Sequence, residues 1–147
     1  MRLLELFSGT NSLGKEFPGE VVSLDIIGTP SFNHIVSDIL EWDYTVYPSN
    51  HCDMVWASPP CIQYSRARTT AKTPRYLEGA DKLILKALEI IDYFSSGSKA
   101  PCFFIENPWS GLLKQRTIMA HLPTPKKANY CKYGFPYQKH TAILDQH

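Results

Sequence analysis

The sequence predicts an α/β protein with a three-layer, Rossmann-like arrangement and a mostly parallel sheet of about seven strands. Three observations predict this fold class. Short apolar and partly β-branched segments alternate with turns and helical patterns along the chain. The clearest helix, over residues 78–94, carries apolar side chains at helical spacing and polar ones elsewhere. The last two predicted strands lie close together around a turn, as in a hairpin.

Each expected element follows from the local pattern. Apolar segments predict strands over residues 2–7, 20–26, 34–38, 53–56, 101–105, 128–133 and 141–144. Helical patterns predict short or long helices over residues 13–17, 39–44, 78–94 and 110–120, with Asp38 capping the second and Ser110 the last. Turns and loops are expected over residues 8–12, 47–51, 62–77 and 134–136. Residues 101–105 are apolar throughout, which predicts a strand buried on both faces.

The composition favours a single domain over residues 1–147. Hydrophobic residues make up 44% of the 147 residues and charged residues 20%, which suits one core and excludes a disordered chain. The net charge of +1 gives no global field toward nucleic acid or membrane. We find no signal peptide and no apolar run that would span a bilayer, so we expect an intracellular protein, cytoplasmic or nuclear/nucleoid, with no membrane partner.

The four cysteines predict free thiols rather than a metal site. They are Cys52, Cys61, Cys102 and Cys131, and no two of them form a CxxC pair. We therefore expect no zinc and a reducing compartment.

The stretch that ends at Cys61 is the first candidate site. Ser58 follows a short apolar strand, and Pro59 and Pro60 stop the ladder because proline lacks a backbone N–H and has a fixed φ. Cys61 is thus expected at the carboxyl end of a strand, where open α/β sheets bind ligands. A thiol on a rigid turn suits a nucleophile. The alternative is a small buried apolar residue, the usual role of a free cysteine.

A second candidate site follows the first predicted strand. Gly9 would let the backbone approach a ligand, and the helix after it would offer N–H donors. Asp25 ends the next strand at the spacing that suits a ribose hydroxyl pair, and Asp38 ends the third. Because parallel strands end at one edge, these groups are expected together. A plain loop at Gly9 and a capping carboxylate at Asp25 are the alternatives.

Two segments contain basic residues and no acid. The first has Arg66, Arg68, Lys72 and Arg75, and the second has Lys126, Lys127, Lys132 and Lys139. Together they suggest a one-sided positive surface that would face phosphates. Two solvated loops are the alternative.

Four motifs occur in order along the chain. They are Leu4-Glu5-Leu6-Phe7-Ser8-Gly9-Thr10, Ser58-Pro59-Pro60-Cys61 with Gln63 and Ser65, Glu106-Asn107, and Tyr133-Gly134-Phe135-Pro136. Together they resemble the cytosine-5 DNA methyltransferases over nearly the whole chain. The resemblance implies the S-adenosylmethionine-dependent methyltransferase form of the Rossmann-like fold. It also implies methyl transfer to carbon 5 of cytosine in DNA, through a covalent cysteine adduct.

The resemblance assigns roles to the matching positions. The implied catalytic residues are Cys61 as nucleophile, Glu106 on the ring-nitrogen edge of cytosine, Pro60 and Asn107. The implied S-adenosyl-L-methionine site consists of Phe7, Ser8, Gly9, Thr10, Asn11, Ser12, Asp25, Ile26, Asp38, Ile39, Ser58 and Pro59. Nucleic acid would contact Ser65, Arg66, Arg68 and Lys139. Arg66 and Arg68 would also favour the thiolate of Cys61.

The chain departs from the family pattern at several positions. Asn11 replaces a second glycine, Ile62 follows the cysteine where glutamine is usual, and Pro108 follows Glu106-Asn107 where valine is usual. No arginine follows the Gly134-Phe135-Pro136 turn. The chain ends at His147, so we expect no separate target recognition domain.

Partners and competing functions follow from these features. DNA is the expected partner, with RNA or a free nucleotide as alternatives. An uncovered sheet edge near the C-terminus favours a protein partner or a homodimer. One competing function is an amino-group methyltransferase, although that class carries an aromatic residue at the position of Cys61. The other is a catalytically impaired subunit that binds cofactor or nucleic acid.

Overall fold

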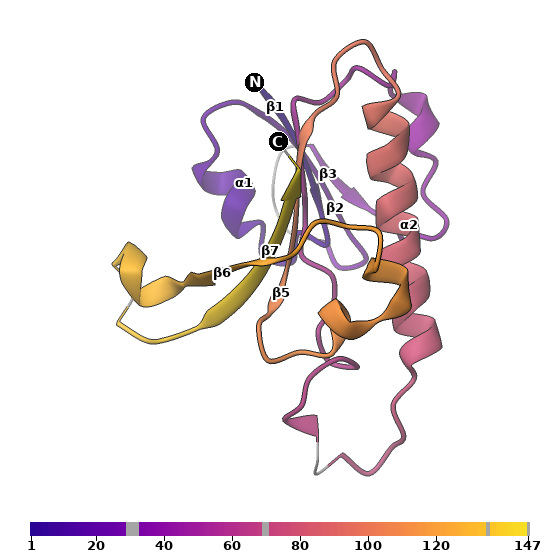
Figure 1. The fold of residues 1–147 in the computed structure, drawn as a ribbon. Coiled ribbons are helices and arrows are strands. Elements are labelled where there is room, and N and C mark those ends of the chain that lie inside the picture. The colour runs from indigo at the N-terminus through magenta and orange to yellow at the C-terminus, as the bar shows by residue number, and fades with distance from the viewer. Residues whose placement is uncertain (29–32, 69–70, 135, 147) are drawn as a thin grey trace.

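Seven strands form one sheet in the computed structural model, which describes residues 1–28, 33–68, 71–134 and 136–146. The sheet order is β3-β2-β1-β4-β5-β7-β6 (Figure 1). The strands are β1 (Arg2–Leu6), β2 (Glu20–Asp25), β3 (His34–Val36), β4 (Met54–Ala57), β5 (Cys102–Pro108), β6 (Lys126–Asn129) and β7 (His140–Gln146). Parts of two predicted features, the loop over 62–77 and the Tyr133–Pro136 motif, lie outside the described residues, as does residue 147.

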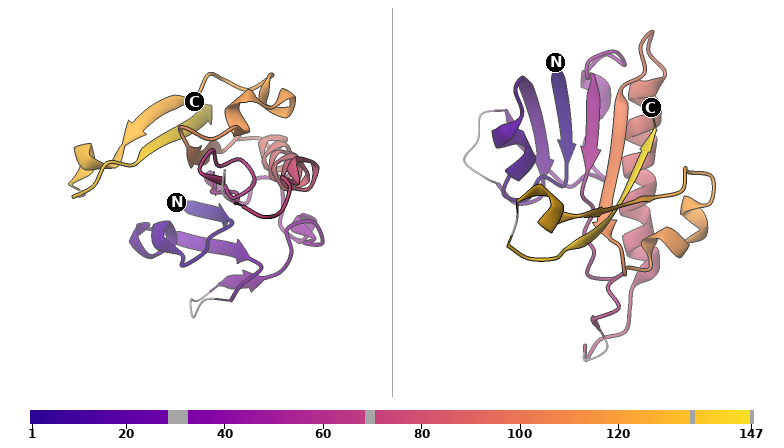
Figure 2. Two further views of the ribbon diagram at one scale, coloured as in Figure 1. Left: turned by 90° about the horizontal axis from the view of Figure 1, so that it is seen from below. Right: turned by 60° about the vertical axis from the view of Figure 1, so that its left-hand side comes forward.

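The helices lie on both faces of this sheet. They are α1 (Ser12–Glu16) and α2 (Leu77–Ser95), with short 3₁₀ helices η1 (Tyr44–Val46), η3 (Leu113–Gln115), η4 (Thr117–Met119) and η5 (Tyr130–Tyr133). Figures 1 and 2 show α1 and α2 on opposite sides of the sheet. The predicted three-layer, mostly parallel α/β fold is confirmed.

The first five strands are parallel, and the last two reverse direction. β1 pairs with β2 and β4, β2 with β3, and β4 with β5, all in parallel. β7 runs antiparallel to β5, and β6 antiparallel to β7. The carboxyl ends of β1 to β5 therefore meet at one edge of the sheet, and all the candidate strand ends lie there.

The main core lies between α2 and one face of the sheet. Alternate strand residues such as Leu4, Leu6, Val55 and Ile105 point to this face and are fully buried. They meet an apolar stripe on α2, whose buried members are Ala80, Ile84, Ala87, Leu88, Ile90, Ile91 and Phe94. Ile84, Ala87, Leu88 and Ile91 are among the residues whose helical spacing predicted the helix.

The opposite face is covered less completely than the sequence predicted. α1 packs against β1 and β2, where Leu3 and Glu5 are buried. Farther along, Cys102 is exposed, and Phe104 is half-buried against Trp56 at a ring-centroid distance of 5.4 Å. The prediction that residues 101–105 are buried on both faces was therefore wrong, because the five-residue α1 packs on β1 and β2, and β4 separates these strands from β5.

Residues 110–120 form the short 3₁₀ helices η3 and η4 in place of the predicted helix, because a tertiary contact interrupts the helical pattern. The backbone N–H of Leu112 donates to the carbonyl of Tyr64 at 2.9 Å, which draws this segment out of a helical hydrogen-bond pattern. Arg116 is extended, with φ −73° and ψ 142°, and separates η3 from η4. The prediction failed because this partner is distant in sequence.

Two smaller expectations also need correction. The predicted helical turn over 39–44 closes one turn on the carbonyl of Asp38, and the helical residues come later, in η1. The predicted strand over 128–133 begins and ends earlier, as β6, because its partner β7 begins only at His140. The chain after β6 continues into η5.

Neither a membrane-crossing helix nor a metal-ligand cluster occurs in the described ranges. No helix there has the length and apolar character to cross a bilayer. No group of three or more His, Cys, Asp or Glu side chains there is arranged to hold a metal ion.

Truncation of a buried side chain on α2 measures how much its packing contributes to the free energy of unfolding. Ile90 is fully buried, so Ile90→Ala should lower the free energy of unfolding by about 2–5 kcal/mol. Leu85 on the same helix is 48% exposed, so Leu85→Ala should change it by less than about 0.5 kcal/mol. Urea denaturation measures both. Equal losses in the two variants would contradict the described packing of α2.

Candidate active site

The diproline turn holds Cys61 at the carboxyl end of β4. Ser58 donates its backbone N–H to the carbonyl of Leu6 at 3.2 Å, and its hydroxyl accepts from the indole N–H of Trp56 at 2.8 Å. The N–H of Tyr64 donates to the carbonyl of Cys61 at 3.0 Å, which closes a turn directly after the cysteine. Cys61 is half-buried, so its sulfur is not sealed in the core.

The other three cysteines differ from Cys61 in exposure. Cys102 and Cys131 are exposed, whereas Cys52 is buried, and burial raises the pKa of its thiol to about 12. Cys52 is therefore an unreactive core residue. All four thiols are free, as the sequence predicted.

Glu106 and Asn107 lie inside β5 rather than after it, because the strand continues to Pro108. They pair with Ile143 and Ala142 of β7. Asn107 is buried, and its side-chain amide donates to the carbonyl of Pro59 at 3.0 Å. This bond ties the end of β5 to the diproline turn of the neighbouring strand.

Glu106 has one buried carboxyl oxygen, which lies beside Lys139. Its Oε1 makes no hydrogen bond among the described residues and lies 3.7 Å from the ammonium of Lys139. Burial acts to lower the pKa of Lys139, but the charge of Glu106 and nearby tyrosines raise it overall. A buried acceptor without a hydrogen bond is costly unless a ligand satisfies it.

A cavity of about 340 Å³ opens beside the turn. It is lined by Phe7, Leu24, Asp25, Ile26, Ser37, Asp38, Ile39, Ser58, Pro60 and Leu83. Seven of these were singled out from the sequence, which missed Leu24, Ser37 and Leu83. Leu83 comes from α2, and only the position of that helix over the strand ends brings it here. The lining therefore combines apolar walls with two carboxylates.

Asp25 joins two turns at the edge of this cavity. Its carboxylate accepts the N–H of Gly9 at 2.8 Å and the N–H of Ile27 at 2.9 Å. Each oxygen keeps a further lone pair for a ligand.

Phe7 has φ 58°, a conformation that a bulky residue rarely adopts. Such strain is typical of functional sites.

The conformation of the turn after β1 explains why asparagine can stand at position 11 in place of a second glycine. Asn11 has φ 58°, which glycine prefers and asparagine tolerates. Its buried side-chain oxygen accepts from the Ser23 hydroxyl at 2.9 Å. A Cβ on Gly14 would come within 2.1 Å of that oxygen, so glycine is required there. Asn11 thus stabilises the turn through the hydrogen bond that its side chain accepts from Ser23.

Four further residues that the sequence assigned to the cofactor site do not line the cavity, namely Ser8, Thr10, Ser12 and Pro59. Thr10 and Ser12 bond to each other through their hydroxyls at 2.9 Å and are exposed. Ser8 is buried, and its hydroxyl has no hydrogen bond among the described residues. Pro59 contributes its carbonyl to Asn107, as described above.

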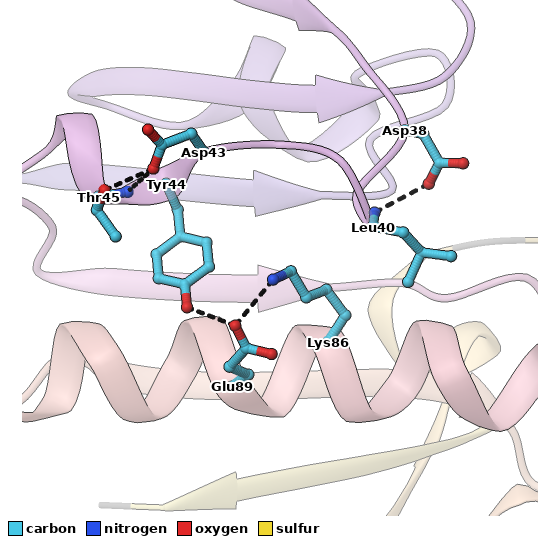
Figure 3. A network of polar contacts seen from close by, with 7 residues as sticks. All are labelled: Asp38, Leu40, Asp43, Tyr44, Thr45, Lys86 and Glu89. Atoms are coloured by element: carbon cyan, nitrogen blue, oxygen red, sulfur yellow. Dashed lines mark hydrogen bonds and ion pairs between the residues drawn. The ribbon is translucent and has the colours of Figure 1, made fainter.

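A polar network attaches the segment after β3 to α2 (Figure 3). Asp38 accepts the N–H of Leu40 at 2.9 Å, which shapes the cavity wall. Farther along, the hydroxyl of Tyr44 donates to Glu89 at 2.5 Å, and Lys86 pairs with Glu89 at 2.8 Å. The hydrogen bond to Glu89 raises the pKa of Tyr44 to about 12.

Comparison with known proteins gives the family. A protein of Frog virus 3 (isolate Goorha), named "Probable DNA (cytosine-5)-methyltransferase", is 33% identical over 160 aligned positions. The match covers 97% of this chain and 69% of that protein. The chain belongs to the DNA (cytosine-5)-methyltransferase family. No family model matches the chain.

Solved methyltransferase structures share the fold of this family member. The Entamoeba histolytica methyltransferase EhMeth superposes with a TM-score of 0.68 at 16% identity, over 98% of this chain and 52% of that one. Dnmt2 of S. pombe gives 0.61 at 16% identity, over 98% and 50%. A Spodoptera frugiperda DNMT2 mutant gives 0.61 at 18% identity, over 99% and 50%. The chain spans about half the length of these structures.

In this methyltransferase family member, a partly buried ion pair holds the turn after Cys61, and no sequence pattern indicated it. Tyr64 is fully buried and donates its hydroxyl to Asp81 of α2 at 2.8 Å. Arg116 donates to the same carboxylate from Nε at 3.1 Å and from Nη2 at 2.5 Å. No local pattern predicts this cluster, because its three residues come from three separate segments.

The four residues predicted to contact nucleic acid have different surroundings. Arg66 is exposed. Arg68 donates to Gln63 at 3.1 Å and to the Thr73 hydroxyl at 2.6 Å, so it stabilises its own loop. The hydroxyl of Ser65 accepts the N–H of Ala67 at 3.2 Å. Lys139 lies beside Glu106, as described above.

Protonation of Asp81 in acid should lower the free energy of unfolding of this family member. Burial acts to raise the pKa of Asp81, but hydrogen bonds from Arg116 and Tyr64 lower it overall. The stabilisation is therefore complete above the unfolded pKa of about 4 and is lost as pH falls through the lower folded pKa. At pH 7, Asp81→Asn should cost about 1.5–3 kcal/mol.

Urea denaturation between pH 3 and pH 7 measures this effect. Asp81→Asn should show a shallower acid loss than the unmodified chain. Asp92→Asn, on the exposed side of α2, is the matched control and should keep the full acid loss. An unchanged acid profile in Asp81→Asn would contradict the assignment.

Proposed function

We propose that this chain transfers a methyl group from S-adenosylmethionine to carbon 5 of cytosine in DNA through a covalent adduct at Cys61. The observation that carries the proposal is the position of the cavity. Ser58 and Pro60 line it, and Cys61 is the next residue along the same turn. The name of the Frog virus 3 relative supports DNA as the substrate.

The cavity suits S-adenosylmethionine by its size and its donor set. Its volume of about 340 Å³ falls within the range of small-molecule sites. Phe7, Ile39 and Leu83 offer apolar surface to an adenine ring. Asp25 offers carboxylate lone pairs to ribose hydroxyls, and Asp38 offers the same to an amino group. When bound, this cofactor supplies an electrophilic methyl group on a sulfonium.

The chain's own residues would prepare cytosine to accept that methyl. The thiolate of Cys61 attacks carbon 6 of the ring, which makes carbon 5 enamine-like and nucleophilic. The carboxylic acid form of Glu106 donates a hydrogen bond to ring nitrogen 3 and accepts one from the amino group, which stabilises the charge that develops on the ring. After methylation, a base removes the proton on carbon 5, and the Cys61 sulfur leaves carbon 6. Asn107 keeps the diproline turn in place throughout.

In duplex DNA the target base must leave the stack before Cys61 can reach it. This costs a few kcal/mol, least for a base that is already unpaired. The half-buried position of Cys61 at the sheet edge is compatible with a base that enters from outside.

Trapping with a fluorinated substrate tests the nucleophile. A 5-fluorocytosine oligonucleotide with S-adenosylmethionine should form a covalent adduct with the chain, because fluorine blocks the final elimination. Denaturing electrophoresis and mass spectrometry detect the adduct and locate it. Cys61→Ala should abolish it, and Cys102→Ala, which removes an exposed thiol, should leave it unchanged.

The absence of any adduct on single- or double-stranded substrate would contradict the covalent mechanism. If the cofactor still bound, the chain would be a catalytically impaired subunit that binds cofactor or nucleic acid. Methyl transfer to an exocyclic amine would instead indicate an amino-group methyltransferase.

Calorimetry tests the cofactor site directly. Asp25→Ala removes a carboxylate that would bond the ribose, and should weaken S-adenosylmethionine binding about 10- to 100-fold. Glu41→Ala removes a nearby exposed carboxylate outside the cavity lining and should leave binding unchanged. Equal affinity for the unmodified chain and Asp25→Ala would contradict the assignment of the cavity.

A further inference from the structure

Two lysines from separate segments meet at one indole ring. Lys114 of η3 places its ammonium 3.7 Å from the ring centroid of Trp109 and donates to the Trp109 carbonyl at 2.5 Å. Lys127 of β6 places its ammonium 5.6 Å from the same centroid. Each contact is a cation–π interaction, so the indole keeps the two ammonium groups near each other.

A third cation belongs to a segment that is bonded to this region: Arg66 comes two residues after Tyr64, whose carbonyl accepts the N–H of Leu112 at 2.9 Å, two residues before Lys114. Burial first, and then the positive charges of Arg66 and Lys127, lower the pKa of Lys114. Arg66 is exposed and belongs to the chain that follows Cys61. Arg66, Lys114 and Lys127, with Trp109, are called the Trp109 cluster below.

The Trp109 cluster carries positive charge without a compensating acid. Among the described residues, none of its three cations forms an ion pair with a carboxylate, whereas the adjacent Lys126 pairs with Asp145 at 2.8 Å. Like charges held together repel each other, and the fold gains nothing from that repulsion. An anion that binds among them would relieve it.

The cluster lies next to the candidate active site. Trp109 directly follows β5, which carries Glu106 and Asn107. The bond from the Leu112 N–H to the Tyr64 carbonyl at 2.9 Å joins the segment that carries Lys114 to the turn after Cys61. A strand of nucleic acid that presents a base to Cys61 would therefore pass close to these cations.

The geometry favours phosphate over base as the bound group. Lys114 occupies the indole at 3.7 Å, and the ring is half-buried, so Trp109 is not a free stacking platform. Ammonium and guanidinium groups bind phosphate oxygens well. Such contacts position a nucleic acid strand without reading its sequence.

We propose that Arg66, Lys114 and Lys127, arranged around Trp109, bind backbone phosphates of the nucleic acid strand next to the target base. The proposal rests on the proposed function for the presence of a nucleic acid substrate. It adds Lys114 and Trp109 to the residues expected near that substrate, and it selects Lys127 from the second basic segment. It also assigns the affinity to backbone contacts that do not depend on sequence.

Salt-dependent binding of a labelled oligonucleotide tests the proposal. Fluorescence anisotropy measures the affinity of the full chain for single-stranded and duplex DNA over a range of salt concentrations. Each phosphate contact contributes about 0.7 to the log–log salt slope for a single strand and about 0.9 for a duplex. Lys114→Gln, Lys127→Gln and Arg66→Gln should each weaken binding several-fold and lower the slope by about that amount.

Lys126→Gln is the matched control. It removes the same charge from the neighbouring position of β6, where the ammonium is paired with Asp145. It should leave the slope nearly unchanged, which separates a specific contact from a general loss of positive charge. The midpoint of urea unfolding for each variant checks that the fold is intact. Lys127→Gln and Arg66→Gln change exposed residues and remain informative if Lys114→Gln is unstable.

Three results would overturn the proposal, and they are distinguishable. If the unmodified chain binds oligonucleotide and forms the Cys61 adduct, but the cluster variants keep its salt slope, the phosphate site is wrong and the proposed function stands. If the unmodified chain binds no oligonucleotide even at low salt, both the cluster and a nucleic acid substrate are wrong. Equal loss in Lys126→Gln and the cluster variants also counts against a specific site.

Discussion

The carboxylate of Asp81 joins three segments that the sequence keeps far apart. It accepts a hydrogen bond from Tyr64, just after Cys61, and a paired contact from Arg116, between η3 and η4. A carboxylate in this position is costly to bury without partners, and here both oxygens are satisfied. The turn that begins with the candidate nucleophile is thereby fixed to the long helix α2, and the segment that follows β5 is held against it.

The strand ends impose the second constraint on the site. Parallel strands bring Phe7, Asp25, Asp38 and Ser58 to one edge, and α2 closes the cavity above them with Leu83. The bond from Asn107 to the Pro59 carbonyl then joins the neighbouring strand to the diproline turn. The cavity and the candidate catalytic turn therefore lie side by side at the end of the same strand.

Sequence patterns predicted the elements that are defined by their own residues. The helical spacing along α2 and the apolar runs of β1, β2 and β4 appear in the structure close to their predicted bounds. Asp25, Asp38 and Ser58 line the cavity, and the sequence brought them to one sheet edge because strand ends can be read from it. The helix expected over residues 110–120 failed because Leu112 bonds to Tyr64, a partner about fifty positions away. Likewise, Asp81 and Arg116 carry no local signal.

The sequence by itself determined the α/β class, the family motifs and the strand-end residues, because these depend on the periodicity and order of nearby side chains. Only the tertiary structure decided which distant groups meet. It brought Asp81 to Tyr64 and Arg116, Leu83 to the cavity, and Lys114 and Lys127 to Trp109. The physical reason is that such contacts depend on how helices and loops pack over the sheet, and packing joins residues whose separation along the chain is arbitrary.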